Sequence, residues 1–175
     1  LKFENILKNE NIDLNQCLSK LDYKKKIDYF IIKYIFEKIT QYNYNSKHFS
    51  FNENSTVEHI LPQNPTQWKL KTKMIQPFVN KIGNLIIIER DLNMIMGNKT
   101  LEDKVNGFLQ NGKKRSYYED ECKYNRILYD SIKKDLALPL YSNNGSKYWN
   151  EQRIHERIIS ISDEFTRAIK NYHSD

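Results

Sequence analysis

The chain has 175 residues, of which 39% are hydrophobic and 13% aromatic, and this excludes a disordered polypeptide and suffices for one folded domain. Its 28 lysines and arginines against 22 acidic residues give a net charge of +6, which favours a polyanionic partner without establishing one. No apolar run approaches the ~18 residues that cross a membrane, and no signal peptide opens the chain, so we expect a soluble, cytoplasmic protein.

The N-terminal part of the chain, residues 1–50, is predicted to be helical. Residues 21–42 repeat apolar side chains at helical spacing, with lysines on the other side, which is typical of an amphipathic helix. The apolar positions of this helix are Ile27, Phe30 or Ile31, Tyr34 or Ile35, and Ile39.

The central part, residues 51–110, is predicted to hold two strands and a short helix. A loop rich in Asn and Ser leads into a strand at 56–60, which Pro62 ends. After a long polar connection, Gly83 introduces the β-branched run NLIIIE, a second strand. Residues 91–98, DLNMIMGN, indicate a short helix that Asp91 could cap.

The C-terminal part, residues 111–175, is predicted to be helical again. A helix is expected from Thr100 to Leu109, at the end of the central part, and two long amphipathic helices follow at 117–136 and 148–171. The sequence therefore predicts a single α+β domain, mostly helical, in which a small ββα core is embedded in amphipathic helices.

Cys17 and Cys122 are the two cysteines of the chain, and they lie far apart. This excludes a C-x-x-C zinc knuckle and a disulfide framework within the chain. We expect two buried thiols in a reducing compartment and no structural zinc.

The stretch TVEHILPQ, residues 56–63, sets Glu58 beside His59 inside an apolar strand. One interpretation is that the alternation of a strand points one side chain inward and the other outward. The other is that both groups serve one reaction, which would require the strand to distort near its end, before Pro62.

The order of several motifs decides between these interpretations. TVEHILPQ is followed by Trp68, by IGNLIII with Asn84, and by LNMIMGNKTLEDK with Asn93. This order resembles the HNH nuclease motif on the ββα-metal fold. More specifically, it resembles the C-terminal HNH-like domain of GmrSD-type, modification-dependent restriction endonucleases and related phage-defence proteins. WNEQRIHER near the C-terminus, which begins at Trp149, resembles the tryptophan-containing helix that closes that domain.

The resemblance implies a metal-dependent DNA endonuclease. His59 would be the general base, and Asn84 would orient it through a hydrogen bond to the backbone of the facing strand. Glu58 and Asn93 would hold one Mg²⁺ or Mn²⁺ ion, because such hard cations prefer oxygen ligands.

Basic residues offer candidate contacts to nucleic-acid phosphates. Lys99 and Lys104 match basic positions of the family, and Arg153 and Arg157 recur at i and i+4 on the last helix. His155 lies between these two arginines, and a solvated helix face is the alternative for all three. His48 and His173 are interpreted as exposed or packing residues, and Trp68 and Trp149 as core residues.

The resemblance also implies parts that this sequence lacks. Family proteins carry an N-terminal, nucleotide-dependent recognition domain, and neither its DGQQR-like motif nor a phosphate loop occurs here. Since the chain begins with Leu, we expect it to be a C-terminal fragment of a longer protein. A non-catalytic DNA-binding or assembly module on the same scaffold and an RNA-cleaving nuclease are the alternatives to a DNA endonuclease.

Overall fold

The computed structural model describes residues 13–99 except 44, 46, 48 and 52, together with 108–110, 113–115 and 149–171. Its elements are α2 (Leu14–Lys20), α3 (Lys26–Asn43), β1 (Ser55–His59), η1 (Thr66–Trp68), α4 (Thr72–Ile75), η2 (Ile82–Asn84), β2 (Leu85–Glu89), α5 (Arg90–Met96), β3 (Phe108–Gln110), β4 (Lys113–Arg115) and α9 (Glu151–Asn171). The predicted class, α+β and mostly helical, is confirmed.

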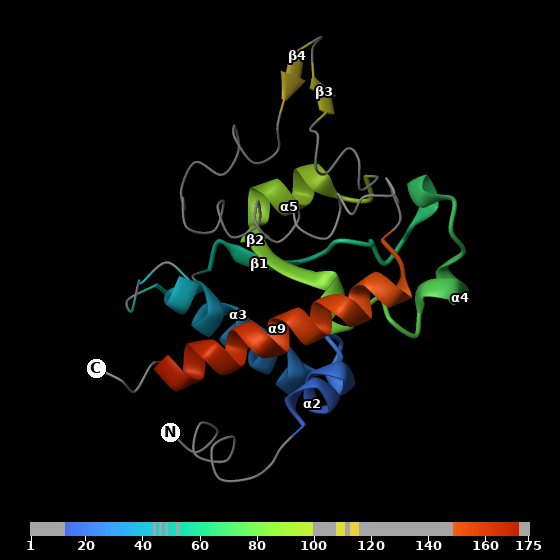
Figure 1. Ribbon diagram of the computed structural model, residues 1–175. Coiled ribbons are helices and arrows are strands. Elements are labelled where there is room, and N and C mark those ends of the chain that lie inside the picture. The colour runs from blue at the N-terminus through green and yellow to red at the C-terminus, as the bar shows by residue number, and fades with distance from the viewer. Residues whose placement is uncertain are drawn as a thin grey trace.

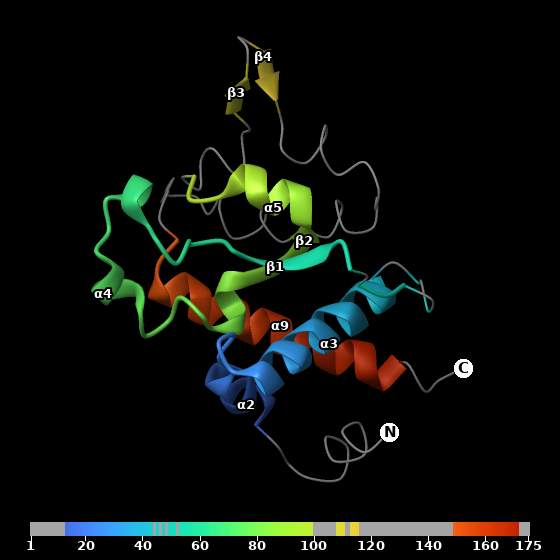
Figure 2. The same ribbon diagram turned by 180° about the vertical axis from the view of Figure 1, so that it is seen from behind.

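Strands β1 and β2 form an antiparallel pair at the centre of the molecule. Their register runs without interruption from Ser55 opposite Glu89 to His59 opposite Leu85. Helix α5 covers one face of this pair, while α3 and α9 cover the other (Figures 1 and 2). Because both faces are covered, the residues Leu85 to Ile88 are all buried, as a continuous β-branched run predicts.

Helices α3 and α9 pack side by side beneath the strands (Figure 1). Each buries residues that recur every three or four positions, which is the spacing of one helix face. The buried residues are Ile32, Ile35, Phe36 and Ile39 of α3, and Ile154, Ile158, Ile161, Phe165, Ala168 and Ile169 of α9.

Gly83 allows α9 to approach the start of β2. A Cβ atom at this position would lie 2.0 Å from the carbonyl oxygen of Ile154, far inside van der Waals contact. Only glycine therefore fits at this position of η2, where α9 packs against it, and this close approach brings Trp149, just before α9, to the strands.

The long N-terminal helix begins five residues later than predicted. The side chain of Asp22 accepts a hydrogen bond from the backbone N–H of Lys24 (2.9 Å), and this local turn replaces the first helical turn. Ile35 and Ile39 are buried as expected. Ile27 is 74% exposed, so its assignment to the apolar face is wrong. Of the alternatives Phe30 and Ile31, Phe30 is 59% exposed and Ile31 packs partly buried against the core.

Three smaller predictions are also wrong. Cys17 is exposed rather than buried. Asp91 lies in the first turn of α5, which begins at Arg90, and so does not cap it. Residues 108 and 109, expected to end a helix, belong to strand β3, which pairs with β4.

Several predictions fall outside the described residues, namely the helix at 117–136, Cys122, His48, His173 and most of the helix at 100–109. Within the part of the chain that the structure describes, no helix is long and apolar enough to cross a membrane.

Candidate active site

Asn84, at the junction of η2 and β2, is fully buried and makes four hydrogen bonds with its side chain. Its Oδ1 accepts from the backbone N–H of Leu61 (2.9 Å) and from the indole N–H of Trp149 (2.8 Å). Its Nδ2 donates to the carbonyl oxygens of Leu61 (2.9 Å) and Val79 (2.7 Å). These bonds use both donors and both lone pairs of the amide, so the position requires Asn rather than Asp.

His59, the last residue of β1, is buried, and its ring contacts the side chains of Asn80, Gln63 and Tyr23. Its Nε2 lies 3.2 Å from Oδ1 of Asn80 and 3.2 Å from Nε2 of Gln63. The Nε2 group of Gln63 donates to the same Oδ1 of Asn80 at 3.0 Å. The ring of Tyr23 meets the imidazole edge to face, with centroids 4.9 Å apart. These contacts hold the imidazole in one orientation.

Tyr23 joins this group through its backbone as well as its ring. Its N–H donates to the carbonyl oxygen of Asn80 (3.1 Å), which ties the link between α2 and α3 to the loop before η2. Burial raises the pKa of Tyr23 above its ordinary value, and the neighbouring Tyr29 raises it further. The phenol beside His59 is therefore neutral at physiological pH.

Asn84 connects the two segments that surround the imidazole. Its bonds to Leu61 fix the chain two residues after His59, and its bond to Val79 fixes the residue before Asn80. The resemblance implies a hydrogen bond from Asn84 to the backbone of the facing strand, whereas the side chain bonds to the backbone of Leu61, two residues after the end of β1. Its effect on catalysis stays a prediction.

Glu58 and Asn93 supply oxygen atoms near the same part of β1. Glu58 is buried, with 5% of its surface exposed. Asn93 extends from α5 and donates from Nδ2 to the carbonyl oxygen of Val57 (3.3 Å), one residue before Glu58. An amide whose nitrogen is bonded to the backbone keeps its oxygen for another partner. A carboxylate and an amide oxygen fit the preference of Mg²⁺ or Mn²⁺ for hard ligands.

Such an ion would complete its coordination with water or phosphate oxygens, as Mg²⁺ usually does. No group of three or more His, Cys, Asp or Glu side chains that could hold a metal ion occurs among the described residues.

The strand does not distort at Glu58 and His59, and this part of the prediction is wrong. Both residues pair regularly with β2, so their side chains point to opposite faces. His59 contacts Tyr23, on the side of the strands where α2, α3 and α9 lie (Figures 1 and 2). Glu58 is therefore directed to the side of α5, which carries Asn93.

The four basic residues predicted to contact nucleic acid have different surroundings. Lys99 is partly exposed, and its carbonyl oxygen accepts from the indole N–H of Trp68 (2.9 Å). Lys104 lies outside the described residues. Arg157 is buried, and its Nη1 donates to the carbonyl oxygens of Gly83 (2.9 Å) and Leu85 (2.7 Å). This placement gives Arg157 a structural role in joining α9 to β2.

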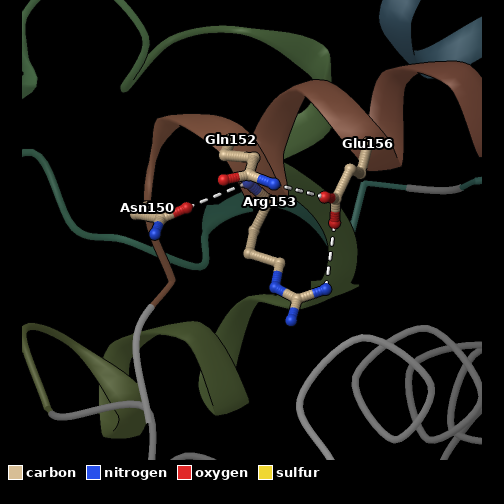
Figure 3. A network of polar contacts seen from close by, with 4 residues as sticks. All are labelled: Asn150, Gln152, Arg153 and Glu156. Carbon is tan, nitrogen blue, oxygen red and sulfur yellow. Dashed lines mark hydrogen bonds and ion pairs between the residues drawn. The ribbon is translucent and has the colours of Figure 1, made fainter. Parts of the chain in front are cut away.

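Arg153 remains at the surface of α9, in a small polar network (Figure 3). Its guanidinium forms an ion pair with Glu156 (2.9 Å), whose other carboxylate oxygen accepts from Gln152 (3.0 Å). Its backbone N–H donates to Oδ1 of Asn150 (3.0 Å), which caps the helix. His155, between the two arginines, is exposed.

The comparison with protein families identifies the family of this chain. The family model for the C-terminal domain of GmrSD restriction endonucleases matches residues 8–163, most of the chain. The chain belongs to this family. No curated protein and no solved structure matches it. The matched region includes Trp149 and the start of α9. Sequence motifs assign this segment, WNEQRIHER, to the same domain as the central core.

Sequence reasoning missed Tyr23 and Asn80 as neighbours of His59. Tyr23 falls within the stretch predicted to be the first turn of a helix, whereas Asn80 lies in a polar connection without periodicity. Asn occurs 20 times in the sequence, so its presence at one position carries little information. Gln63 was visible as the last residue of TVEHILPQ, although its contact with His59 was not predictable from that pattern. Trp149 is buried, as expected of a core residue, and Trp68 is partly buried.

Proposed function

We propose that this domain hydrolyses phosphodiester bonds in DNA with a divalent cation, and that His59 acts as its general base. Membership of the restriction endonuclease family supports nuclease activity. The observation that carries the assignment of the base is the fixed orientation of the buried imidazole between Asn80 and Tyr23. A general base must be held in position, and histidine exchanges protons near neutral pH.

In this proposal, His59 removes a proton from the attacking water, while Glu58 and Asn93 would hold the cation. A bound cation stabilises negative charge on the phosphoryl and leaving oxygens. The attacking and leaving oxygens lie on opposite sides of the phosphorus atom. The base and the cation ligands therefore have to reach the same phosphate group, whereas the regular pairing of β1 directs Glu58 and His59 to opposite faces and does not by itself bring them together.

Two basic side chains are proposed to contact the phosphate backbone of the substrate. Lys99 follows α5 and is partly exposed, and 27% of the Arg153 side chain is exposed. The surface ion pair of Arg153 with Glu156 is worth about 0–1 kcal/mol, so a phosphate group can replace the carboxylate. The net charge of +6 acts in the same direction.

We also propose that a different part of a longer protein recognises modified DNA and supplies nucleotide control. The matched family model describes a C-terminal domain of restriction endonucleases, which is in keeping with this division.

Supercoiled-plasmid nicking tests the proposed substrate and cation. Wild-type protein should nick plasmid DNA with Mg²⁺ or Mn²⁺ and lose this activity in EDTA, on modified and unmodified plasmids tested side by side. Cleavage that continues unchanged in EDTA would contradict the role of the cation. Faster cleavage of RNA than of DNA of the same sequence would contradict the proposed substrate.

Isothermal calorimetry with MnCl₂ tests the proposed cation ligands separately. Glu58→Gln should weaken Mn²⁺ binding at least ~10-fold, because a charged oxygen ligand becomes a neutral amide. Glu53→Gln is the matched control, since Glu53 is exposed two residues before β1 and lies outside the proposed site. Equal Mn²⁺ affinity of the wild type and Glu58→Gln would exclude Glu58 as a ligand.

A further inference from the structure

We propose that Asn80 holds the neutral imidazole of His59 in the tautomer that carries its proton on Nε2. In this tautomer the lone pair of the neutral ring is on Nδ1, so Nδ1 is the basic nitrogen. The catalytic consequence rests on the proposed function, whereas the tautomer itself does not. Asn80 thereby becomes a positioning residue for the general base.

The geometry of three atoms supports this tautomer. His59 Nε2, Asn80 Oδ1 and Gln63 Nε2 form a nearly equilateral triangle with sides of 3.0, 3.2 and 3.2 Å. Seen from Gln63, the other two atoms are therefore only about 60° apart, whereas the two N–H bonds of a planar amide diverge by about 120°. Gln63 can therefore point an N–H bond straight at only one of them, and bonds to both would each be bent by about 30°.

The remaining arrangement satisfies all three groups. Gln63 donates to Oδ1 of Asn80, and His59 donates to the same oxygen from Nε2. An amide oxygen has two lone pairs with a broad range of acceptance, so it can take both bonds. A His59 ring with an unprotonated Nε2 would instead set a nitrogen lone pair 3.2 Å from an oxygen lone pair in a buried site, which is unfavourable.

Asn80 is held in place independently of His59. Its side chain is buried, with 5% exposed, and its carbonyl oxygen accepts from the N–H of Tyr23 (3.1 Å). The carbonyl of the preceding residue, Val79, is bonded to Asn84 (2.7 Å). These bonds fix the backbone that carries the side chain, and Oδ1 itself accepts from Gln63 (3.0 Å), so the acceptor is held by contacts other than the imidazole.

Nuclear magnetic resonance of the ¹⁵N-labelled chain tests the tautomer without any measurement of activity. At a pH where imidazole is neutral, wild-type His59 should show an Nε2–H signal protected from exchange with water. Asn80→Leu, of similar volume, should lose this signal, and Asn80→Asp, which keeps an acceptor oxygen, should retain it. His155 is the internal control, because its exposed ring should show no protected N–H signal in any variant.

Nicking kinetics test the consequence for the reaction. Asn80→Leu should lower kcat about 10- to 100-fold, by analogy with the residues that orient metal-ligating histidines, with KM for plasmid little changed. Asn80→Asp should recover most of the rate.

The outcomes separate this proposal from the proposed function. A wild-type His59 protonated on Nδ1, or a protected Nε2–H that survives in Asn80→Leu, overturns the role of Asn80 whether or not the protein is a nuclease. If Asn80→Leu does not fold, the wild-type spectrum and Asn80→Asp still decide the tautomer. The expected spectra from a wild-type protein that never nicks DNA would support the tautomer and refute the nuclease.

Discussion

Replacing Asn84 by Asp removes two hydrogen-bond donors from the centre of the site with almost no change of volume. The carboxylate can still accept from Leu61 and Trp149, but it places an oxygen against the carbonyl oxygens of Leu61 and Val79. Each buried carbonyl that loses its donor costs about 1–3 kcal/mol, so the two together cost about 2–6 kcal/mol. This is a large part of the 5–15 kcal/mol that typically stabilises a domain.

Urea unfolding, followed by circular dichroism, measures this loss as a lower midpoint at an unchanged m-value. Asn150→Asp is the matched control, because Asn150 is exposed and caps α9 through Oδ1, an atom that Asp also provides. It should change the free energy of unfolding by less than about 0.5 kcal/mol. If Asn84→Asp costs less than about 1 kcal/mol, or no more than Asn150→Asp, the two donated bonds do not hold the site together.

Three further changes test the packing around the site. Gly83→Ala should cost about 3 kcal/mol or more in thermal unfolding, because its Cβ would lie 2.0 Å from the carbonyl oxygen of Ile154; an unchanged Tm would contradict this close approach. Trp149→Phe should cost about 1–2 kcal/mol in urea, because a buried amide oxygen loses its donor, and the partly buried Trp68→Phe should cost less; the reverse order would refute this reasoning. Folding favours the neutral phenol of Tyr23, whose pKa is raised above 10.0, so the free energy of unfolding should fall as pH rises from about 10 through the folded-state pKa. Tyr23→Phe should make this fall shallower, and an identical fall in both proteins would exclude that contribution.

The strands and helix faces were predictable where local pattern and tertiary packing agree. The run from Leu85 to Ile88 suits a strand buried on both faces, and α5 and α9 do cover both faces. Pattern and packing disagree at the start of α3. There Ile27 and Phe30 continue the apolar periodicity but remain exposed, since the core takes the overlapping face that includes Ile32.

The site was predictable only as a set of residues, not as an arrangement. The motif order selected His59, Asn84 and Asn93, while the alternation of β1 directs Glu58 away from His59. The recurrence of basic residues at Arg153 and Arg157, four positions apart, suggested a phosphate contact for Arg157. Its spacing, three residues after Ile154 and four before Ile161, instead puts it on the apolar face of α9, where its guanidinium bonds to backbone carbonyls.

The divalent-cation-dependent nicking rate of His59→Ala is the most direct measurement of the central claim. His155→Ala is the matched control, because it removes an exposed imidazole from α9. Loss of a general base should lower the rate ~10²- to 10⁴-fold in His59→Ala, with the fold intact by circular dichroism and His155→Ala close to wild type. A folded His59→Ala protein that nicks plasmid DNA as fast as the wild type would contradict the assignment of His59 as the base.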